Sequence, residues 1–402
     1  MKSTVSLLIA IVHFYYSRKP CLDGGSNFVR PESLRIENYK SEKNYSPRSL
    51  LSLMSNNLPP IYFYFPYGKS STNLPKNVES YWSWQCTEYS ISPMQSGGCF
   101  WTLQTYLHLN DYGFPCKLVD TMPDEGIVLA HRDFLDTSFQ PGPRLLLVCL
   151  RADVDRHPYA QLHVVQNPHQ AIPSRSMELW ESHFIPHWPQ PSIIPRAAER
   201  GDAFENVTFL GNAVNLVSEL RDQNWHDQLK ALGLKFQVKL SHDEWHDYSD
   251  TDVVLAIRNF GLQNDWRGKP ASKLYSAWHS GAPAILGHES AFQAERKSDL
   301  DYLEATSVEE VIACLRQLRD NKTLRKEMVQ NGWVRAQETC QNAMVTKWQS
   351  FLTSFAVPAY QNWCIMPQWK QKVFFRSRQS FVGSRPIYYA LKHYLFNLAK
   401  KT

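Results

Sequence analysis

The sequence predicts an α/β protein with two Rossmann-like domains facing a cleft, followed by a basic C-terminal helical tail. Short continuous apolar runs alternate with amphipathic helical patterns, as they do where a parallel sheet buries its strands on both faces. The 402 residues are enough for two separate cores. A proline-rich stretch at 186–191 divides the chain in the middle. We therefore expect one domain at 59–195, a second at 205–355, and ligand binding in the cleft between them.

The first half predicts five strands separated by helices and loops. A helix with Phe100, Leu103 and Leu107 on one face follows the first strand and ends near Gly113. The expected strands are Ile61–Phe65, Lys117–Val119, Gly126–Ala130, Leu145–Val148 and Leu162–Val165.

Residues 1–58 predict an N-terminal arm. The run Val5–Val12 resembles the apolar core of a signal peptide, but it is too short to span a bilayer and no small-residue cleavage site follows it. A buried strand or a disordered leader is the favoured interpretation.

The second half repeats the β–α rhythm. A helix over about 271–280 ends before Gly281, as a glycine-capped helix does. Ser307 and Glu310 predict a capping box that opens another helix with an apolar face. The expected strands are Val207–Leu210, Phe236–Lys239, Val253–Ile257 and Ala284–Leu286.

Charge is distributed unevenly along the chain. Residues 339–402 contain nine Lys or Arg and no acidic residue, which leaves 34 basic and 38 acidic residues in the remainder. A neutral-to-acidic body is not typical of a nucleic-acid-binding protein, so no nucleic-acid partner is expected. From the composition of the tail, residues 356–402, we expect that it docks on an anionic membrane surface, that part of it forms a helix returning to the first domain, or both. Scattered cysteines without a CxxC pair favour a reducing, cytoplasmic location, peripheral to the membrane if the tail docks.

The segment from Arg258 to Glu289 carries the strongest chemical signal. Arg267, Lys269 and Lys273 gather at the start of the predicted 271–280 helix, with Pro270 expected at its first position. A helix start carries a partial positive charge and favours acidic neighbours, so cations there indicate a missing anion. Arg258 ends a predicted strand at the edge where α/β folds bind ligands. Together these cations predict a diphosphate site, and solvated surface cations are the alternative.

This segment resembles the donor site of GT-B glycosyltransferases. The residues that carry the likeness run from Lys269 to Glu289, KPASKLYSAWHSGAPAILGHE, with a basic residue before an Ala-containing helix, then Gly-x-Pro, a strand and an acidic residue. The resemblance covers about 205–355 well and 59–190 loosely. It implies a nucleotide-diphosphate sugar as co-substrate, with Arg258 and Lys273 on the phosphates and Glu289 on ribose or sugar hydroxyls. Retaining members commonly carry two glutamates seven residues apart; Glu289 has no such partner, so the anomeric outcome stays open.

Two motifs of the first half are candidates for the other side of the cleft. Gly97 and Gly98 at a helix start resemble the glycine-rich turn of this family, with a plain tight turn as the alternative. His131 and Asp133 follow a predicted strand, and either is a candidate base for activating an acceptor hydroxyl. A structural turn or an ion pair is the alternative.

Two further motifs are excluded as decoys. His131-Arg132-Asp133 matches a kinase triplet, but the Asn expected five residues later is Ser138 and no glycine-rich loop or Asp-Phe-Gly is present. His242 and His246 have zinc-peptidase spacing, but the first His is followed by Asp rather than Glu. A capping box from Ser241 to Glu244 explains that segment better, and no metal site is expected.

The sequence therefore predicts a glycosyltransferase of hexosyltransferase type with no cofactor. It would move a sugar from a nucleotide-diphosphate sugar to a carbohydrate or lipid-linked hydroxyl acceptor. A sugar-nucleotide epimerase or hydrolase on the same fold and a non-catalytic nucleotide- or glycan-binding module are the alternatives.

Overall fold

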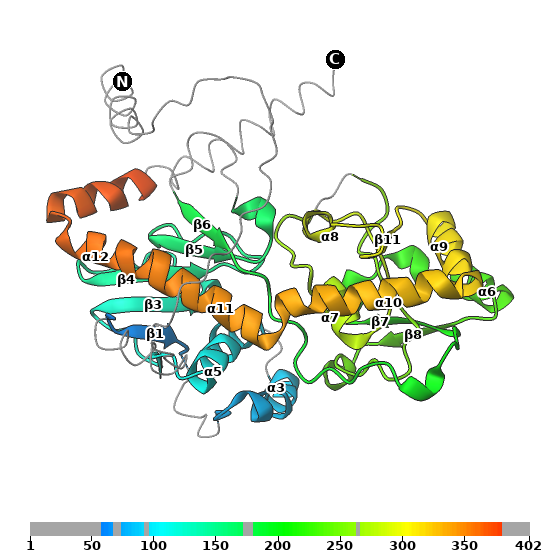
Figure 1. The fold of residues 1–402 in the computed structure, drawn as a ribbon. Helices are drawn as coiled ribbons and strands as arrows, with labels where there is room; N and C mark the ends of the chain where they lie inside the picture. The colour runs from blue at the N-terminus through cyan, green and yellow to red at the C-terminus, as the bar shows by residue number, and fades with distance from the viewer. Residues whose placement is uncertain (1–57, 67–73, 92–95, 172–179, 263–265, 380–402) are drawn as a thin grey trace, which may run out of the picture. The chain divides into compact units, whose positions relative to one another are not determined.

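The computed structural model describes residues 58–66, 74–91, 96–171, 180–262 and 266–379. The predictions for the N-terminal arm up to residue 57 and for the tail beyond 379 lie outside these ranges. The described chain contains two parallel sheets, of six and five strands, with helices between the strands (Figure 1). The prediction of an α/β fold with two parallel sheets is confirmed.

The first sheet has the strand order β2-β1-β3-β4-β5-β6, and all of its pairs are parallel. The central strands β3 and β4 are buried at every position, which explains their continuous apolar sequences. All five predicted strands are present. The edge strand β6 was not predicted, because its sequence ESHF has no apolar run. The strands are β1 Ile61–Tyr64, β2 Lys117–Val119, β3 Gly126–His131, β4 Leu145–Leu150, β5 Leu162–Val165 and β6 Glu181–Phe184.

The second sheet has the strand order β11-β10-β9-β7-β8 and is also parallel. All four predicted strands are present, and the two-residue edge strand β11 was not predicted. The strands are β7 Asn206–Leu210, β8 Lys235–Lys239, β9 Val253–Ala256, β10 Ala284–Leu286 and β11 Leu303–Glu304.

Helices connect the strands and cover the sheets. In the first half they are α3 Val78–Ile91, α4 Ser96–Gly98, η2 Cys99–Leu103, α5 Gln104–Asp111, η3 Arg132–Phe134 and η4 Pro168–Gln170. The second half contains η5 Ala198–Arg200, η6 Ala213–Asn215, η7 Ser218–Leu220, α6 Gln223–Ala231, η8 His242–Glu244, α7 Ser272–Ser280, α8 Ser290–Glu295, α9 Val308–Asp320, α10 Lys322–Ala336 and η9 Gln337–Thr339.

The C-terminal helices return to the first sheet. α11 (Gln341–Phe351), η10 (Leu352–Ala356) and α12 (Val357–Ile365) follow α10, and residues 368–379 form a further helix. Met344, Trp348 and Trp363 are buried in the same core as Ile61 and Phe63 of β1. The described part of the tail therefore packs against the first domain, as the returning-helix interpretation expects.

Helix ends test three local predictions. Gly281 caps α7 in the left-handed region at φ 71°, as expected. Ser307 caps α9 by accepting from the Glu310 amide at 3.2 Å, while the Glu310 carboxylate accepts from the Thr306 amide. The placement of Pro270 at the first position of α7 is wrong, because the cap is Ala271 and Pro270 precedes it.

The order of strands places a switch point in each sheet. From β1 the chain moves to β2 on one side and then to β3 on the other, and from β7 it moves to β8 and then to β9. In open α/β sheets, ligands bind beyond the carboxyl ends of the strands at such points. The segments of interest are therefore those that follow β1, β3, β7 and β9.

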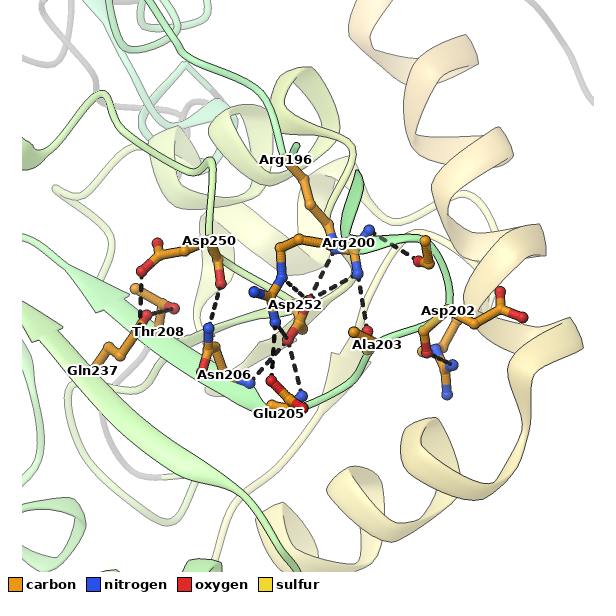
Figure 2. Close-up of polar contacts among 12 residues, drawn as sticks. Arg196, Arg200, Asp202, Ala203, Glu205, Asn206, Thr208, Gln237, Asp250 and Asp252 are labelled. Atoms are coloured by element: carbon orange, nitrogen blue, oxygen red, sulfur yellow. Dashed lines mark hydrogen bonds and ion pairs between the residues drawn. The ribbon is translucent and has the colours of Figure 1, made fainter. Parts of the chain in front are cut away.

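At the amino end of the strands of the second sheet, Asp252 lies directly before β9 and joins several segments. Figure 2 shows Arg196 and Arg200 pointing at its carboxylate, with donor distances of 2.6 to 3.0 Å. The backbone amides of Glu205 and Asn206 also donate to it, each at 2.9 Å. Asp252 thus joins the segment that leads into β7 to the start of β9.

Cysteine chemistry and membrane spans add little to the fold. No disulfide joins the cysteines of the described ranges, which are Cys86, Cys99, Cys116, Cys149, Cys314, Cys340 and Cys364. No helix among the described residues is long and apolar enough to cross a membrane.

Candidate functional site

Arg258 lies just beyond the carboxyl end of β9, at the switch point of the second sheet. Its Nε donates to Asn215 Oδ1 at 3.1 Å, and its Nη1 pairs with Glu289 Oε2. The guanidinium also lies over the Trp266 ring, 5.9 Å from its centroid. These contacts hold the side chain in one orientation at the sheet edge.

Glu289 is buried at the start of α8, one of its oxygens facing Arg258. Its Oε1 is also buried and has no hydrogen-bond partner among the described residues. Burial raises the pKa of Glu289, and the charge of Arg258 offsets part of that increase. A buried acceptor without a donor costs free energy unless a further group supplies one.

Lys273, in the first turn of α7, is a cation without a counter-charge. Within the described ranges it forms no hydrogen bond or ion pair. Its Nζ lies over the Trp245 ring, 5.8 Å from the ring centroid. Its Nζ approaches the backbone of Gly211, directly after β7, so closely that a Cβ there would lie 3.0 Å away. Burial, and then the charge of Arg258, lower the pKa of Lys273 to about 8. Two cations, Lys273 and Arg258, therefore lie near one another at the β7/β9 switch point, and the Glu289 carboxylate pairs with Arg258.

The first turn of α7 has no side-chain cap. Its cap residue, Ala271, has no side chain that accepts hydrogen bonds from the first amides of the helix. These amides and the helix dipole favour an anion at the same end as Lys273.

The contacts of Lys269 and Arg267 bear on the predicted cation cluster at the start of α7, whose role in phosphate binding stays a prediction. Lys269 forms an ion pair with Asp153, which follows β4. Arg267 is exposed and has contacts of its own. Lys273 thus has no counter-charge among the described residues, whereas Lys269 has one in Asp153, which sequence reasoning missed because it lies 116 residues away from its partner.

Residues following β5 bind the loop before α7, and they too were missed. Gln166 Nε2 donates to the carbonyl of Gly268 at 2.9 Å. Asn167 Nδ2 donates to the carbonyl of Lys269 at 3.1 Å and to Ser290 Oγ at 3.0 Å. Both side chains are buried. A single Gln or Asn does not by itself indicate such a role in a sequence. Its position directly after a buried strand is the signal that could have found it.

Backbone strain occurs in the same region. Ala152 and Trp266 adopt φ of 48° and 49°, a conformation rare for residues with a side chain. Ala152 precedes Asp153, and Trp266 precedes the loop that Asp153 contacts. Strain of this kind is retained where surrounding contacts fix it and often marks functional sites.

In the first sheet, His131 ends β3 and is 1% exposed. Its Nδ1 accepts a hydrogen bond from the Asp133 amide at 3.3 Å, so in the neutral ring Nε2 carries the proton. That Nε2 has no partner among the described residues. Burial lowers the pKa of His131, which keeps the ring neutral. The Asp133 side chain is half exposed, 3.5 Å from His131 Nδ1.

Gly97 and Gly98 allow a close approach between the α4 start and the end of β3. A Cβ on Gly97 would lie 3.0 Å from His131 Nε2, and one on Gly98 would lie 2.1 Å from the Phe134 ring. Gly98 has ordinary helical angles, and neither glycine has positive φ. The glycines are therefore part of a helix start, with the role of admitting His131 and Phe134.

The segment His242–His246 shows no metal-binding geometry. The described residues contain no group of three or more His, Cys, Asp or Glu that could hold a metal ion. The Ser241 hydroxyl bonds to Asp243 rather than capping a helix, so the capping-box interpretation is wrong; the three-residue η8 is too short for one. His242 and His246 instead pack on the Trp82 ring, at 4.9 and 5.4 Å.

Comparisons with known proteins give weak likenesses to glycosyltransferases, the class that the 269–289 motif resembles. No protein-family model matches the chain, and no curated protein matches it in sequence. Sucrose-phosphate synthase from Thermosynechococcus elongatus is 11% identical over 77% of this chain and 92% of that one, with a TM-score of 0.41. HepE of Anabaena, in complex with UDP-glucose, is 13% identical over 74% and 100%, with a TM-score of 0.40.

A pneumococcal O-GlcNAc transferase, GtfA, in complex with UDP and GlcNAc, is 14% identical with a TM-score of 0.39. That match covers 57% of this chain and 56% of GtfA. Scores of this size carry no argument about activity, which has to be inferred from the site itself.

Proposed function

We propose that this protein is a glycosyltransferase that transfers a hexosyl group from a nucleotide-diphosphate sugar to a hydroxyl acceptor. The observation that carries the proposal is Lys273: a largely buried cation that has no counter-charge among the described residues, beside Arg258, at an uncapped helix start. Two positive groups and free amides at the switch point of a parallel sheet suit a diphosphate.

The diphosphate would be held and then stabilised as a leaving group by the same residues. Lys273 and the first amides of α7 would bind its oxygens, and Arg258 would add a second cation while Asn215 and Glu289 orient it. Negative charge grows on the diphosphate as the bond to the sugar breaks, and fixed positive groups lower the free energy of that transition state. Lys269, which pairs with Asp153, and the exposed Arg267 would have supporting roles at most.

Glu289 and His131 would contact the sugar nucleotide through their unpartnered atoms. Glu289 Oε1 would accept from a ribose or sugar hydroxyl, and His131 Nε2 would donate to an oxygen near Gly97. Because that tautomer makes His131 a donor, Asp133 is the better candidate for the acceptor-side base, with its half-exposed carboxylate.

The test is nucleoside diphosphate release from a panel of sugar nucleotides. A thermal-shift screen against the common nucleoside diphosphates first selects the base, since a ligand that binds only the folded state raises the unfolding temperature. Release that depends on an added glycan or lipid-linked acceptor is expected. Release without acceptor would identify a hydrolase, interconversion of the sugar an epimerase, and binding without turnover a non-catalytic module.

Replacing Glu289 by glutamine is expected to weaken binding of the sugar nucleotide by about 10-fold, the usual cost of losing one charged hydrogen bond. Calorimetry with the sugar nucleotide and with the nucleoside diphosphate, which lacks the sugar but keeps the ribose, locates the contact. Equal losses indicate ribose or the orientation of Arg258, and a loss with the sugar nucleotide alone indicates the sugar. Unchanged affinity for both would remove Glu289 from the site, and Glu304→Gln, which alters a nearby acid paired with His288, is the control.

A further inference from the structure

The helix formed by residues 368–379 buries one face against the first core. Gln371 Nε2 donates to the carbonyls of Pro143 at 3.2 Å and Trp363 at 2.8 Å. The Phe374 and Phe375 rings lie 5.0 and 5.6 Å from that of Trp363, and Arg378 is buried. Positions 371, 374, 375 and 378 have the spacing of a single helical face, so this side of the helix is fully used.

The opposite face of the same helix combines exposed apolar side chains with cations. Trp369 and Val373 are 63% and 42% exposed, and Lys372 and Arg376, also exposed, complete the spacing 369, 372, 373 and 376. Ile365, at the end of α12, is 79% exposed. Lys370 lies over the Trp369 ring at 5.5 Å. We name Ile365, Trp369, Lys370, Lys372, Val373 and Arg376 the 365–376 face.

The chain segment that carries the 365–376 face is basic. Residues 339–402 include no acidic side chain. On the elements packed beneath the helix, Glu125 forms an ion pair with Arg144 at 3.2 Å, which balances its charge. Tryptophan beside aliphatic side chains and lysines is the composition of a surface that inserts into the headgroup region of a bilayer with anionic lipids.

We propose that the 365–376 face docks this protein on an anionic lipid bilayer. Trp369, Val373 and Ile365 enter the headgroup region, and Lys370, Lys372 and Arg376 contact lipid phosphates and carboxylates. The helix is tied to Gly142 and Pro143, before the amino end of β4, through Trp363 and Gln371. His131 lies at the carboxyl end of the neighbouring β3, so docking leaves that edge of the sheet open. The proposal does not depend on the transferase assignment.

Co-sedimentation of the full chain with vesicles tests the proposal. Binding is expected to vesicles with about one third phosphatidylserine and not to pure phosphatidylcholine, and to decline with salt. Lys370→Gln with Lys372→Gln is expected to lower the partition coefficient about 30-fold, because each removed lysine loses one lipid contact. Trp369→Ser with Val373→Ser is expected to lower it as well.

A matched control removes the same kinds of side chain elsewhere. Val334 is 69% exposed on α10, and Lys326 is exposed beside Asp202, so Val334→Ser with Lys326→Gln should leave vesicle binding unchanged. Thermal melts of each variant confirm folding. Equal binding to neutral vesicles, no binding to either, or full binding by both 365–376 variants would overturn the proposal; the last result would assign binding to another segment.

Discussion

Replacing Lys273 by methionine is expected to weaken nucleoside diphosphate binding about 100-fold while raising the unfolding temperature of the free protein. The affinity loss follows from removing a charged donor that no other group can replace, worth roughly 1.5–3 kcal/mol. Turnover should fall further, by about 1000-fold, if the lysine also stabilises the departing diphosphate. Calorimetry and steady-state kinetics measure the two effects separately.

The gain in stability has a different cause. Burial and Arg258 lower the pKa of Lys273 from 10.5 to about 8, so the folded state disfavours the charged form that predominates in the unfolded chain at neutral pH. Methionine fills a similar volume without charge and removes that cost, which should raise the unfolding temperature by about 2–4 °C. A lysine with a structural role would give the opposite sign.

The control for this pair of effects is Lys297→Met. Lys297 is exposed and pairs with Glu338, so its removal changes net charge equally without touching the α7 start. It should leave affinity unchanged. Binding by Lys273→Met with the affinity of the unaltered protein would remove the basis of the proposed function.

The affinity for the diphosphate should also depend on pH through the protonation of Lys273. As pH rises through about 8, Lys273 of the free protein loses its proton, and affinity for the diphosphate should decrease. In Lys273→Met the affinity should be flat across this range. A decrease that persists in the variant would assign the titration to another group.

The sequence predicts a strand where the residues of the strand themselves form an apolar run, and misses it where they do not. The apolar runs at Gly126–Ala130 and Val253–Ile257 predicted strands within one or two residues, because a strand buried on both faces is apolar throughout. The edge strands Glu181–Phe184 and Leu303–Glu304 carry no such run. Their place in the sheet depends on neighbours rather than on their own residues.

The positions of the proposed site residues at strand and helix ends predicted which of them lie near one another, but the sequence did not predict the partners around them. Arg258, Lys273 and Glu289 do lie near one another, since each follows a strand or opens a helix at the same sheet edge. What sequence could not supply were partners more than 100 residues away, such as Asp153 for Lys269 and Asn167 for the loop before α7. The Asp153 contact matters for the site, because it gives Lys269 a counter-charge that the sequence does not reveal.

Replacing Asp252 by asparagine is expected to destabilise the protein by about 3 kcal/mol, the cost of leaving buried cations without their counter-charge. Asp252 is 2% exposed and is the shared acceptor for Arg196, Arg200 and two backbone amides (Figure 2). Urea unfolding followed by tryptophan fluorescence measures the change. Asp250→Asn, at a half-exposed carboxylate that pairs with Lys239, should cost less than about 1 kcal/mol.

The acid limb of stability should depend on the same carboxylate. Burial raises the pKa of Asp252, but the hydrogen bonds from Arg200, from the amides of Glu205 and Asn206 and from Arg196 outweigh it and hold the pKa below 3.8. Its contribution is therefore complete above about pH 4 and is lost as pH falls through the folded-state value. Asp252→Asn should flatten that part of the curve.

Asp252→Asn and Lys273→Met should affect different properties, stability and binding, because the two residues lie at opposite ends of the strands of one sheet. Asp252 lies before β9, and Arg258 lies after it, so the strand stands between the buried carboxylate and the proposed diphosphate site. Asp252→Asn should lose stability and keep its nucleotide affinity at low temperature, whereas Lys273→Met should gain stability and lose affinity. If Asp252→Asn lost affinity in proportion to stability, the two ends would be energetically coupled, and Lys273 could not be treated as an independent anion site.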